Sequence, residues 1–260
     1  MQYPDAELER RVRAGLPVEI ELFGSSSPAA RVIRRGGVIA SVSPATPERS
    51  LFNSVYADDP DELPALLNEL EATYEEAGVR AWTVWLPAGH PLGTGLLADR
   101  GHALDGAPRS MGVALADLRP PAREPAAGVE LRSARGLAEI GAVNDAAYRL
   151  EGAWGTALSG EPSVDVRWLV AADGDRPIAC AGAIDAGDDA CVTAVASLPE
   201  RQGEGLASLL IAALLTAAAE RGLSTATLQA SRAGAPVYER LGFRDVGNTE
   251  MWERRSDAPE

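Results

Sequence analysis

The stretch of this sequence best suited to chemistry is a glycine-rich turn between an apolar strand and an apolar helix. Small and β-branched residues over 191–197 predict a buried strand, which Pro199 ends because proline has no N–H for a sheet. Gly203 and Gly205 follow, and an apolar repeat of helical spacing begins at Leu206. The first turn of a helix leaves N–H groups without partners, and glycines let a phosphate reach them. The pattern predicts an anion site, with an ordinary structural turn as the alternative.

This turn and the residues after it resemble the GNAT N-acetyltransferase superfamily. Gln202-Gly-Glu-Gly-Leu-Ala207 matches Q/R-x-x-G-x-G/A, the acyl-CoA pyrophosphate motif of that family. A predicted strand over 225–230 follows, and Pro236–Phe243 looks like the family's short helix ending in Tyr-x-x-x-Gly-Phe. The turn matches neither a P-loop nor the G-x-G-x-x-G fingerprint. The resemblance implies direct transfer of an acyl group from acyl-CoA to an amine.

The resemblance also implies which residues hold acetyl-CoA, the expected cosubstrate, without a metal. Backbone groups of the strand would pair with the pantetheine arm, and the turn and helix start would hold the pyrophosphate. The implied cofactor-binding residues are Val195, Ser197, Gln202, Gly203, Glu204, Gly205, Leu206, Ala207, Ser208 and Ser231. Ser231 departs from the family's frequent Asn and Gly234 from its Ala, although a serine still makes a hydrogen bond.

Acyl transfer to an amine needs two proton transfers, one from the amine and one to the departing CoA thiolate. The resemblance gives the second task to Tyr238 as the catalytic acid, against the alternative of a tyrosine packed in the core. His90 and His102 fall in the first half of the chain and are not expected to act as the base. A relay through water is the preferred interpretation. The carboxylates that stay open for this role are Asp145, Glu151, Asp185 and Glu250.

The acceptor is expected to lie against residues 144–148 and 151–154, where Tyr148 and Trp154 are the predicted substrate-binding residues. Trp154 stands on a glycine-bracketed loop, so it is either a wall of the pocket or an anchor of the loop to the core. The sequence predicts a small-molecule or peptide amine without choosing among antibiotic, amino acid, polyamine and protein N-terminus. It also leaves a homodimer open.

Hydrophobic periodicity in the second half predicts the elements that must position this site. Apolar and alternating runs predict strands over 129–133, 166–172, 177–184 and 191–197. Apolar residues at helical spacing predict helices over 136–149 and 206–221, while residues 150–162 suggest a loop or a broken helix.

The first half shows a similar order of strand, helix, strand, short helix and strand, which predicts an internal duplication. It begins with a short helix over 6–13, and in place of the glycine turn it has the segment 56–62, which contains four acidic residues. Because such acids repel a pyrophosphate, this half is expected not to bind CoA. The arrangement resembles tandem GNAT proteins similar to mycothiol synthase. The predicted domains are a degenerate repeat over 1–118, a Pro-rich linker over 119–128 and a catalytic domain over 129–260.

Composition limits the partners that this chain is expected to have. All 24 basic residues are arginine, and 38 acidic residues give a net charge of −14, which argues against nucleic acid. The charge favours a cationic or amine substrate, although solubility alone also explains it. No apolar run suggests a membrane span and no signal peptide is indicated. With only two cysteines, both expected to be buried and reduced, a cytoplasmic protein is expected.

Together these patterns predict an α/β protein of two GNAT-like repeats, each a mixed, mostly antiparallel central sheet flanked by helices. The expected activity is transfer of an acetyl group from acetyl-CoA to an amine. Two alternatives remain. One is a catalytically silent acyl-CoA-binding sensor or scaffold, and the other is an interaction protein whose glycine turn is only structural.

Overall fold

The computed structural model describes residues 3–256, and the chain forms two compact units. Unit 1 takes the chain up to Gly15 together with Arg109–Gly155 and Val164–Gly247. Unit 2 takes Leu16–Pro108, Thr156–Ser163 and the chain from Asn248. Neither unit is continuous in sequence, so the units do not follow the predicted boundaries at 118 and 128. The outer ends of the predicted domains, residues 1 and 260, lie outside the described residues.

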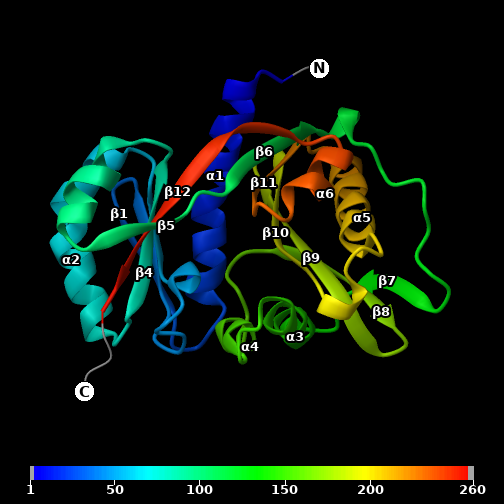
Figure 1. Cartoon of the computed structure of the whole chain (residues 1–260), viewed down its shortest axis with the longest axis horizontal. Coiled ribbons are helices and arrows are strands. Elements are labelled where there is room, and N and C mark those ends of the chain that lie inside the picture. The colour runs from blue at the N-terminus through cyan, green and yellow to red at the C-terminus, as the bar shows by residue number, and fades with distance from the viewer. Residues whose placement is uncertain (1–2, 257–260) are drawn as a thin grey trace. The chain divides into compact units, whose positions relative to one another are not determined.

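Unit 1 is organised around a sheet with the strand order β7-β8-β9-β10-β11-β6 (Figure 1). Neighbouring strands are antiparallel except β10 and β11, which are parallel. A parallel pair needs a crossover connection, and helix α5 (Leu206–Glu220) supplies it. The strands are β6 (Arg109–Ala114), β7 (Val129–Ser133), β8 (Val166–Asp173), β9 (Arg176–Ala186), β10 (Asp189–Ser197) and β11 (Thr225–Ala230).

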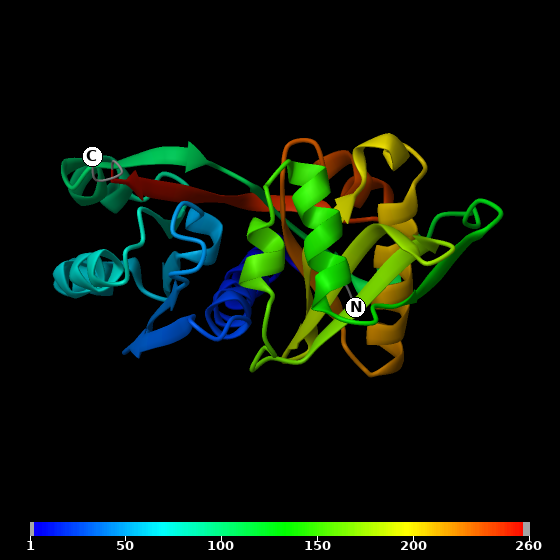
Figure 2. The same ribbon diagram turned by 90° about the horizontal axis from the view of Figure 1, so that it is seen from below.

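Helices cover both faces of this sheet. Helix α3 (Leu137–Tyr148) and helix α5 pack on the same strands, β8 to β10, from opposite sides (Figure 2). Helix α5 is apolar around most of its circumference and buries nine of its side chains, which explains its place over the centre of the sheet. The short helix α6 (Ala235–Arg240) and the start of α4 (Ala153–Ala157), up to Gly155, complete the unit.

Unit 2 contains a second sheet, in the order β1-β2-β3-β4-β12, with β5 also paired to β12. Strands β3 and β4 are parallel, and helix α2 (Leu63–Glu76) connects them. The apolar stripe of α2 packs into a core with Trp82 and Val84 of β4. The strands are β1 (Arg31–Arg35), β2 (Val38–Val42), β3 (Ser54–Ala57), β4 (Ala81–Pro87), β5 (His102–Gly106) and β12 (Arg244–Arg255).

The two sheets share one topology, which is three strands in antiparallel order followed by a crossover helix and a parallel strand. In each unit the strand beyond the parallel pair comes from the other half of the sequence. Strand β6 pairs with β11 in unit 1, and residues 249–255 of β12 pair with β4 in unit 2. This exchange is the reason that no cut near the linker separates the units. The predicted fold of two mixed, mostly antiparallel sheets flanked by helices is confirmed.

Helix α1 (Asp5–Ser25) is much longer than the predicted 6–13 and continues through Pro17. In unit 1 its Leu8 packs on Gly112 of β6, where a methyl group would lie 3.1 Å from the Leu8 Cβ. This close approach places the first turns of α1 directly on the sheet. Within residues 3–256, no helix has the length and hydrophobicity required to cross a bilayer.

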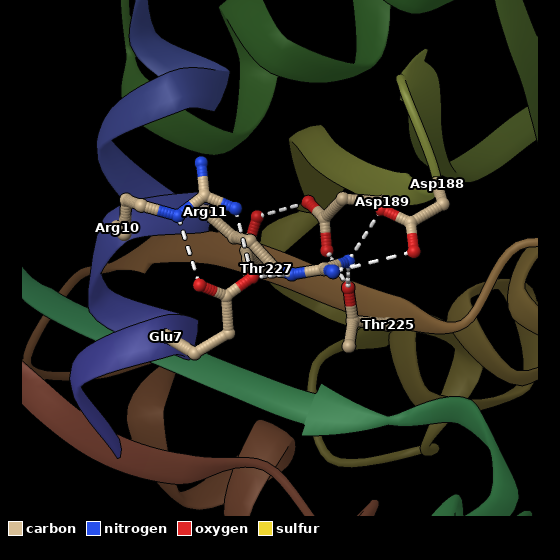
Figure 3. Close-up of polar contacts among 7 residues, drawn as sticks. All are labelled: Glu7, Arg10, Arg11, Asp188, Asp189, Thr225 and Thr227. Carbon is tan, nitrogen blue, oxygen red and sulfur yellow. Dashed lines mark hydrogen bonds and ion pairs between the residues drawn. The ribbon is translucent and has the colours of Figure 1, made fainter. Parts of the chain in front are cut away.

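A polar cluster then fixes α1 to the ends of β10 and β11 (Figure 3). The Arg11 guanidinium donates to Glu7 at 2.7 Å, to Asp188 at 2.7 Å and to the hydroxyl of Thr225 at 2.8 Å. Asp189 is 2% exposed, and its two oxygens accept hydrogen bonds of 2.5 Å from the hydroxyls of Thr225 and Thr227. The cluster joins elements that are far apart in the sequence, so the part of α1 up to Gly15 belongs to unit 1 and is not an appendage.

Candidate functional site

The candidate site lies in unit 1, where β10 and β11 separate. The two strands pair only from Asp189 to Cys191 on β10. Farther along β10 the register with β9 shifts between Thr193 and Ala196, and Ala194 has a left-handed φ of 49°. This is a β-bulge, which bends a strand and ends regular pairing. The end of β10 is therefore left without a ladder to β11 among the described residues.

A cavity of about 640 Å³ opens at this separation. Its walls come from the end of β10, the glycine turn, the start of α5, the turn into α6, α6 itself and the linker after β6. The predicted cofactor-binding residues that line it are Val195, Ser197, Gln202, Gly203, Gly205, Leu206, Ala207, Ser208 and Ser231. Glu204 does not line it, because its carboxylate accepts hydrogen bonds of 2.8 and 3.0 Å from Arg201.

The glycine turn has the conformation that its sequence requires. Gly203 and Gly205 have φ of 84° and 75°, in the left-handed region that residues with a Cβ avoid. Helix α5 begins directly after Gly205, and no side chain caps its first N–H groups. Those donors carry partial positive charge at the edge of the cavity, so the turn fits a phosphate group.

The corresponding helix start in unit 2 is chemically different. Strand β3 leads through the 3-10 turn Pro60–Glu62 into α2, and the carboxylate of Asp59 accepts a hydrogen bond from the N–H of Asp61 at 3.0 Å. A carboxylate thus already binds a backbone N–H at the start of the turn that leads into α2, where an incoming phosphate would meet like charge.

Four arginines line the cavity, and three of them have no carboxylate partner among the described residues. Arg201 is neutralised by Glu204 and by Asp173, the latter at 2.9 Å. Arg119, Arg123 and Arg240 make no ion pair there. In a chain with a net charge of −14, this gathers uncompensated positive charge around the glycine turn. The sequence did not predict these three arginines as site residues, because the local sequence of the linker and of α6 does not indicate that either segment borders the cavity.

Tyr238 lies on α6 and borders the same cavity. Its side chain is 8% exposed, its ring meets Phe243 edge-on at 5.9 Å, and its hydroxyl has no hydrogen-bond partner in the described part of the chain. Burial raises the pKa of Tyr238 above its usual value, so the phenol keeps its proton at neutral pH. A protonated phenol at a cavity wall is suited to donate a proton.

The two residues predicted to bind the acceptor differ in their placement. Tyr148 ends α3, lines the cavity with 53% of its surface exposed, and donates a hydrogen bond of 3.3 Å to the Val195 carbonyl. Trp154 is 5% exposed and is not among the lining residues. Its backbone N–H donates to Asp145 at 2.8 Å. Trp154 therefore anchors α4 in the core, which is the alternative that its glycine-bracketed position left open.

None of the carboxylates that the sequence left open as a base lines the cavity. Asp145 accepts from the N–H groups of Trp154 and Gly155, and Asp185 pairs with Arg221. The other two are Glu151 and Glu250, and Glu250 accepts hydrogen bonds from the Gly89 N–H and the Trp252 indole in unit 2.

A buried thiol lies behind the bulge. Cys180 receives a hydrogen bond from Asn144 at 3.2 Å and donates to the Ala194 carbonyl at 3.4 Å, and burial raises the pKa of Cys180 to about 12. A thiol with that pKa stays protonated at neutral pH, so it is not a ready base. Within residues 3–256, no cluster of His, Cys, Asp and Glu is arranged to hold a metal.

Solved structures resemble this chain over nearly all of its length. A GCN5-related N-acetyltransferase from Kribbella flavida is 20% identical with a TM-score of 0.67, and the match covers 95% of this chain and 96% of that one. A tandem GNAT protein from the clavulanic acid biosynthesis pathway is 14% identical with a TM-score of 0.60, covering 98% and 97%. At such identities the likeness shows a shared fold. Among curated protein sequences, none matches this chain.

The sequence itself matches one family model. Residues 165–245 match the model described as the acetyltransferase (GNAT) domain. That range runs from β8 to the start of β12, and it contains the β10 bulge, the glycine turn and Tyr238. The fold, the cavity and the family model agree on the same segment. Residues 165–245 of this chain therefore match the GNAT acetyltransferase domain in sequence and lie in a fold shared with GNAT N-acetyltransferases.

Proposed function

We propose that unit 1 binds acetyl-CoA in the cavity between β10 and β11 and transfers its acetyl group directly to an amine. The observation that carries this proposal is the coincidence of three features in one cavity. The strands separate at a bulge, the uncapped start of α5 and three unpaired arginines face the opening, and a protonated tyrosine lies in its wall. When bound, the cosubstrate supplies a thioester whose acyl carbon an amine can attack.

Each part of the site has a separate task in this proposal. The N–H groups at the start of α5, opened by Gly203 and Gly205, bind the pyrophosphate, and the unpaired edge of β10 around Val195 and Ser197 aligns the pantetheine arm. Tyr238 holds a proton at its phenol oxygen and gives it to the departing sulfur. Since none of the described residues that line the cavity is a carboxylate, water in the cavity takes the proton of the amine.

The acceptor is a small-molecule or peptide amine that reaches the cavity past Tyr148, the aromatic side chain exposed at its wall. The acidic surface favours such a cation over a nucleic acid. We further propose that the protein acts in the cytoplasm, without a membrane partner.

The test is turnover of the full-length protein and of the Tyr238→Phe variant. Release of CoA thiol is measured with acetyl-CoA and a panel of small amines and peptides. Removal of the phenol proton should lower kcat roughly 100-fold or more, the range of general acid catalysis, while the Kd for acetyl-CoA stays unchanged. A wild-type rate in the variant would exclude Tyr238 as the acid. Binding without turnover across the whole panel would favour the silent sensor instead.

A further inference from the structure

The linker contributes a cation to the glycine turn. Residues 119–128 follow β6 in unit 1, and the backbone N–H of Arg119 donates to the Leu241 carbonyl after α6 at 2.9 Å. Farther along, Arg123 Nη1 donates to the Glu204 carbonyl at 2.8 Å. A methyl group added at Gly205 would lie 2.7 Å from Arg123 Cζ, so the guanidinium rests directly on the Gly205 backbone.

The bonding of Arg123 is incomplete for a guanidinium. This group has five N–H donors. Within the described residues Arg123 makes one hydrogen bond with them, to the Glu204 carbonyl. Arg201, on the same turn, shows the contrasting case, because two carboxylates already neutralise it. Arg123 therefore brings a positive charge and free donors to the one place where the glycines expose backbone N–H groups.

The guanidinium also fills the space that Gly205 leaves open. A methyl group built on Gly205 would clash with this guanidinium, so Arg123 lies beside the backbone at which α5 begins. The bond to the Glu204 carbonyl has an ionised donor but a neutral acceptor, whereas a bond to phosphate has both partners ionised, so exchange of one for the other is favourable.

We propose that Arg123 is a phosphate-binding residue that the linker supplies to the glycine turn. It rests on the Glu204 carbonyl when the site is empty, and it exchanges that carbonyl for phosphate oxygens when a pyrophosphate-containing ligand binds. This inference rests on the proposed function for the identity of the ligand, but the phosphate contact itself can be tested separately.

The experiment is calorimetric titration of the full chain and of the Arg123→Ala variant with three probes, namely acetyl-CoA, S-acetylpantetheine and inorganic pyrophosphate. Loss of a charge-assisted phosphate contact should weaken acetyl-CoA and pyrophosphate binding about 10-fold. Binding of S-acetylpantetheine, which has no pyrophosphate, should not change. Arg123→Lys should restore part of the affinity, because it keeps the charge and loses the planar fork.

A matched control removes an arginine outside the cavity. Arg135→Ala also deletes one positive charge, from an exposed pair with Asp175, and should leave all three affinities unchanged. Melting temperatures of the variants check that each one folds. Arg123 is exposed and bonded to a backbone carbonyl, so its replacement should shift the melting temperature little.

The outcomes separate this inference from the proposed function. Wild-type affinity of Arg123→Ala for acetyl-CoA and pyrophosphate would overturn the inference and leave the acetyl-CoA site standing. Tighter binding by the variant would also overturn it, because Arg123 would then only obstruct the site. If pyrophosphate binds and depends on Arg123 while acetyl-CoA does not bind, the inference holds and the proposed function fails. Binding of neither probe would overturn both.

Discussion

At the scale of single residues, the cavity of unit 1 combines backbone donors with cations that carboxylates do not neutralise. The backbone donors are accessible because of the left-handed conformations of Gly203 and Gly205. The cations are the side chains of Arg119, Arg123 and Arg240. Most other arginines of the chain form ion pairs with nearby carboxylates, such as Arg132 with Glu139 at 2.7 Å. These three arginines differ from most others in the chain because no carboxylate neutralises them, and a bound phosphate would provide that negative charge.

Replacement of Gly205 by alanine tests the glycine turn. The new Cβ would impose a strain of about 1–2 kcal/mol at a φ of 75° and would lie 2.7 Å from Arg123 Cζ. We expect the Kd for acetyl-CoA to rise by at least about 10-fold, a loss of about 1.4 kcal/mol. Titration calorimetry measures this change.

Gly187→Ala is the matched control for this substitution. Gly187 has a similar φ of 67°, a methyl group added there would have no atom within 4 Å, and the residue lies outside the cavity. The variant should share the backbone strain and keep the wild-type Kd. Unchanged acetyl-CoA affinity in Gly205→Ala would remove the turn from the binding site.

The sequence could predict the parts of this site that lie within one continuous motif. The turn residues and Tyr238 lie in one continuous segment, and the resemblance of that segment to the GNAT superfamily was sufficient to single them out. Arg123 contacts a residue 81 positions away, and only the folded chain brings them together. For Trp154 the sequence was ambiguous, because a tryptophan between glycines fits a pocket wall and a core anchor equally well. Its burial in the structure favours the core anchor.

At the scale of elements, the ends of β10 have opposite roles. Its last residues leave the sheet at the bulge and open the cavity, whereas its first residue, Asp189, is bound into the cluster that fixes α1. Asp188 and Asp189 are neighbours in sequence, but Asp188 is exposed and pairs with Arg11 while Asp189 is buried between two threonines. These surroundings shift their pKa values in opposite directions.

The opposite pKa shifts of Asp188 and Asp189 should be visible in the pH dependence of the free energy of unfolding. The hydrogen bond from Arg11 lowers the pKa of Asp188 below 3.8, so its stabilising effect is present above that pH and is lost as the pH falls. Burial raises the pKa of Asp189 above 3.8, so the folded state favours its protonated form, and its contribution declines as the pH rises through the folded pKa.

The measurement compares urea unfolding of wild type with Asp188→Asn and with Asp189→Asn between about pH 2 and about pH 7. Relative to wild type, Asp188→Asn should become less stable as the pH rises, and Asp189→Asn should become more stable. The same trend in both variants would contradict the assignment of opposite shifts.

Elements with a clear hydrophobic period were predictable, and those without one were not. Strands β8 to β11 and helices α3 and α5 lie where the pattern predicts them. Strand β3 has only four residues, β5 is mostly exposed, and β12 is rich in charged residues, so none of them produces a period that stands out from a loop. Their places are set by the partner strands, which are distant in the sequence.

At the scale of the whole molecule, two units of one topology differ at the start of their crossover helices. In unit 1 the helix follows glycines in left-handed conformations, and in unit 2 it follows acidic residues, of which Asp59 is itself hydrogen-bonded to the backbone. The start of the crossover helix therefore suits a phosphate in unit 1 and disfavours one in unit 2. We accordingly propose that the chain carries one competent and one degenerate GNAT-like repeat.

Titration of the full-length protein with acetyl-CoA tests this account most directly, because it reports affinity and stoichiometry together. With one competent and one degenerate repeat, we expect one molecule bound per chain with a Kd of about micromolar, in the range usual for enzyme substrates. We expect that binding to be lost in Gly205→Ala. Two molecules per chain would contradict the assignment of unit 2 as degenerate, and no binding at all would contradict the acetyl-CoA site in unit 1.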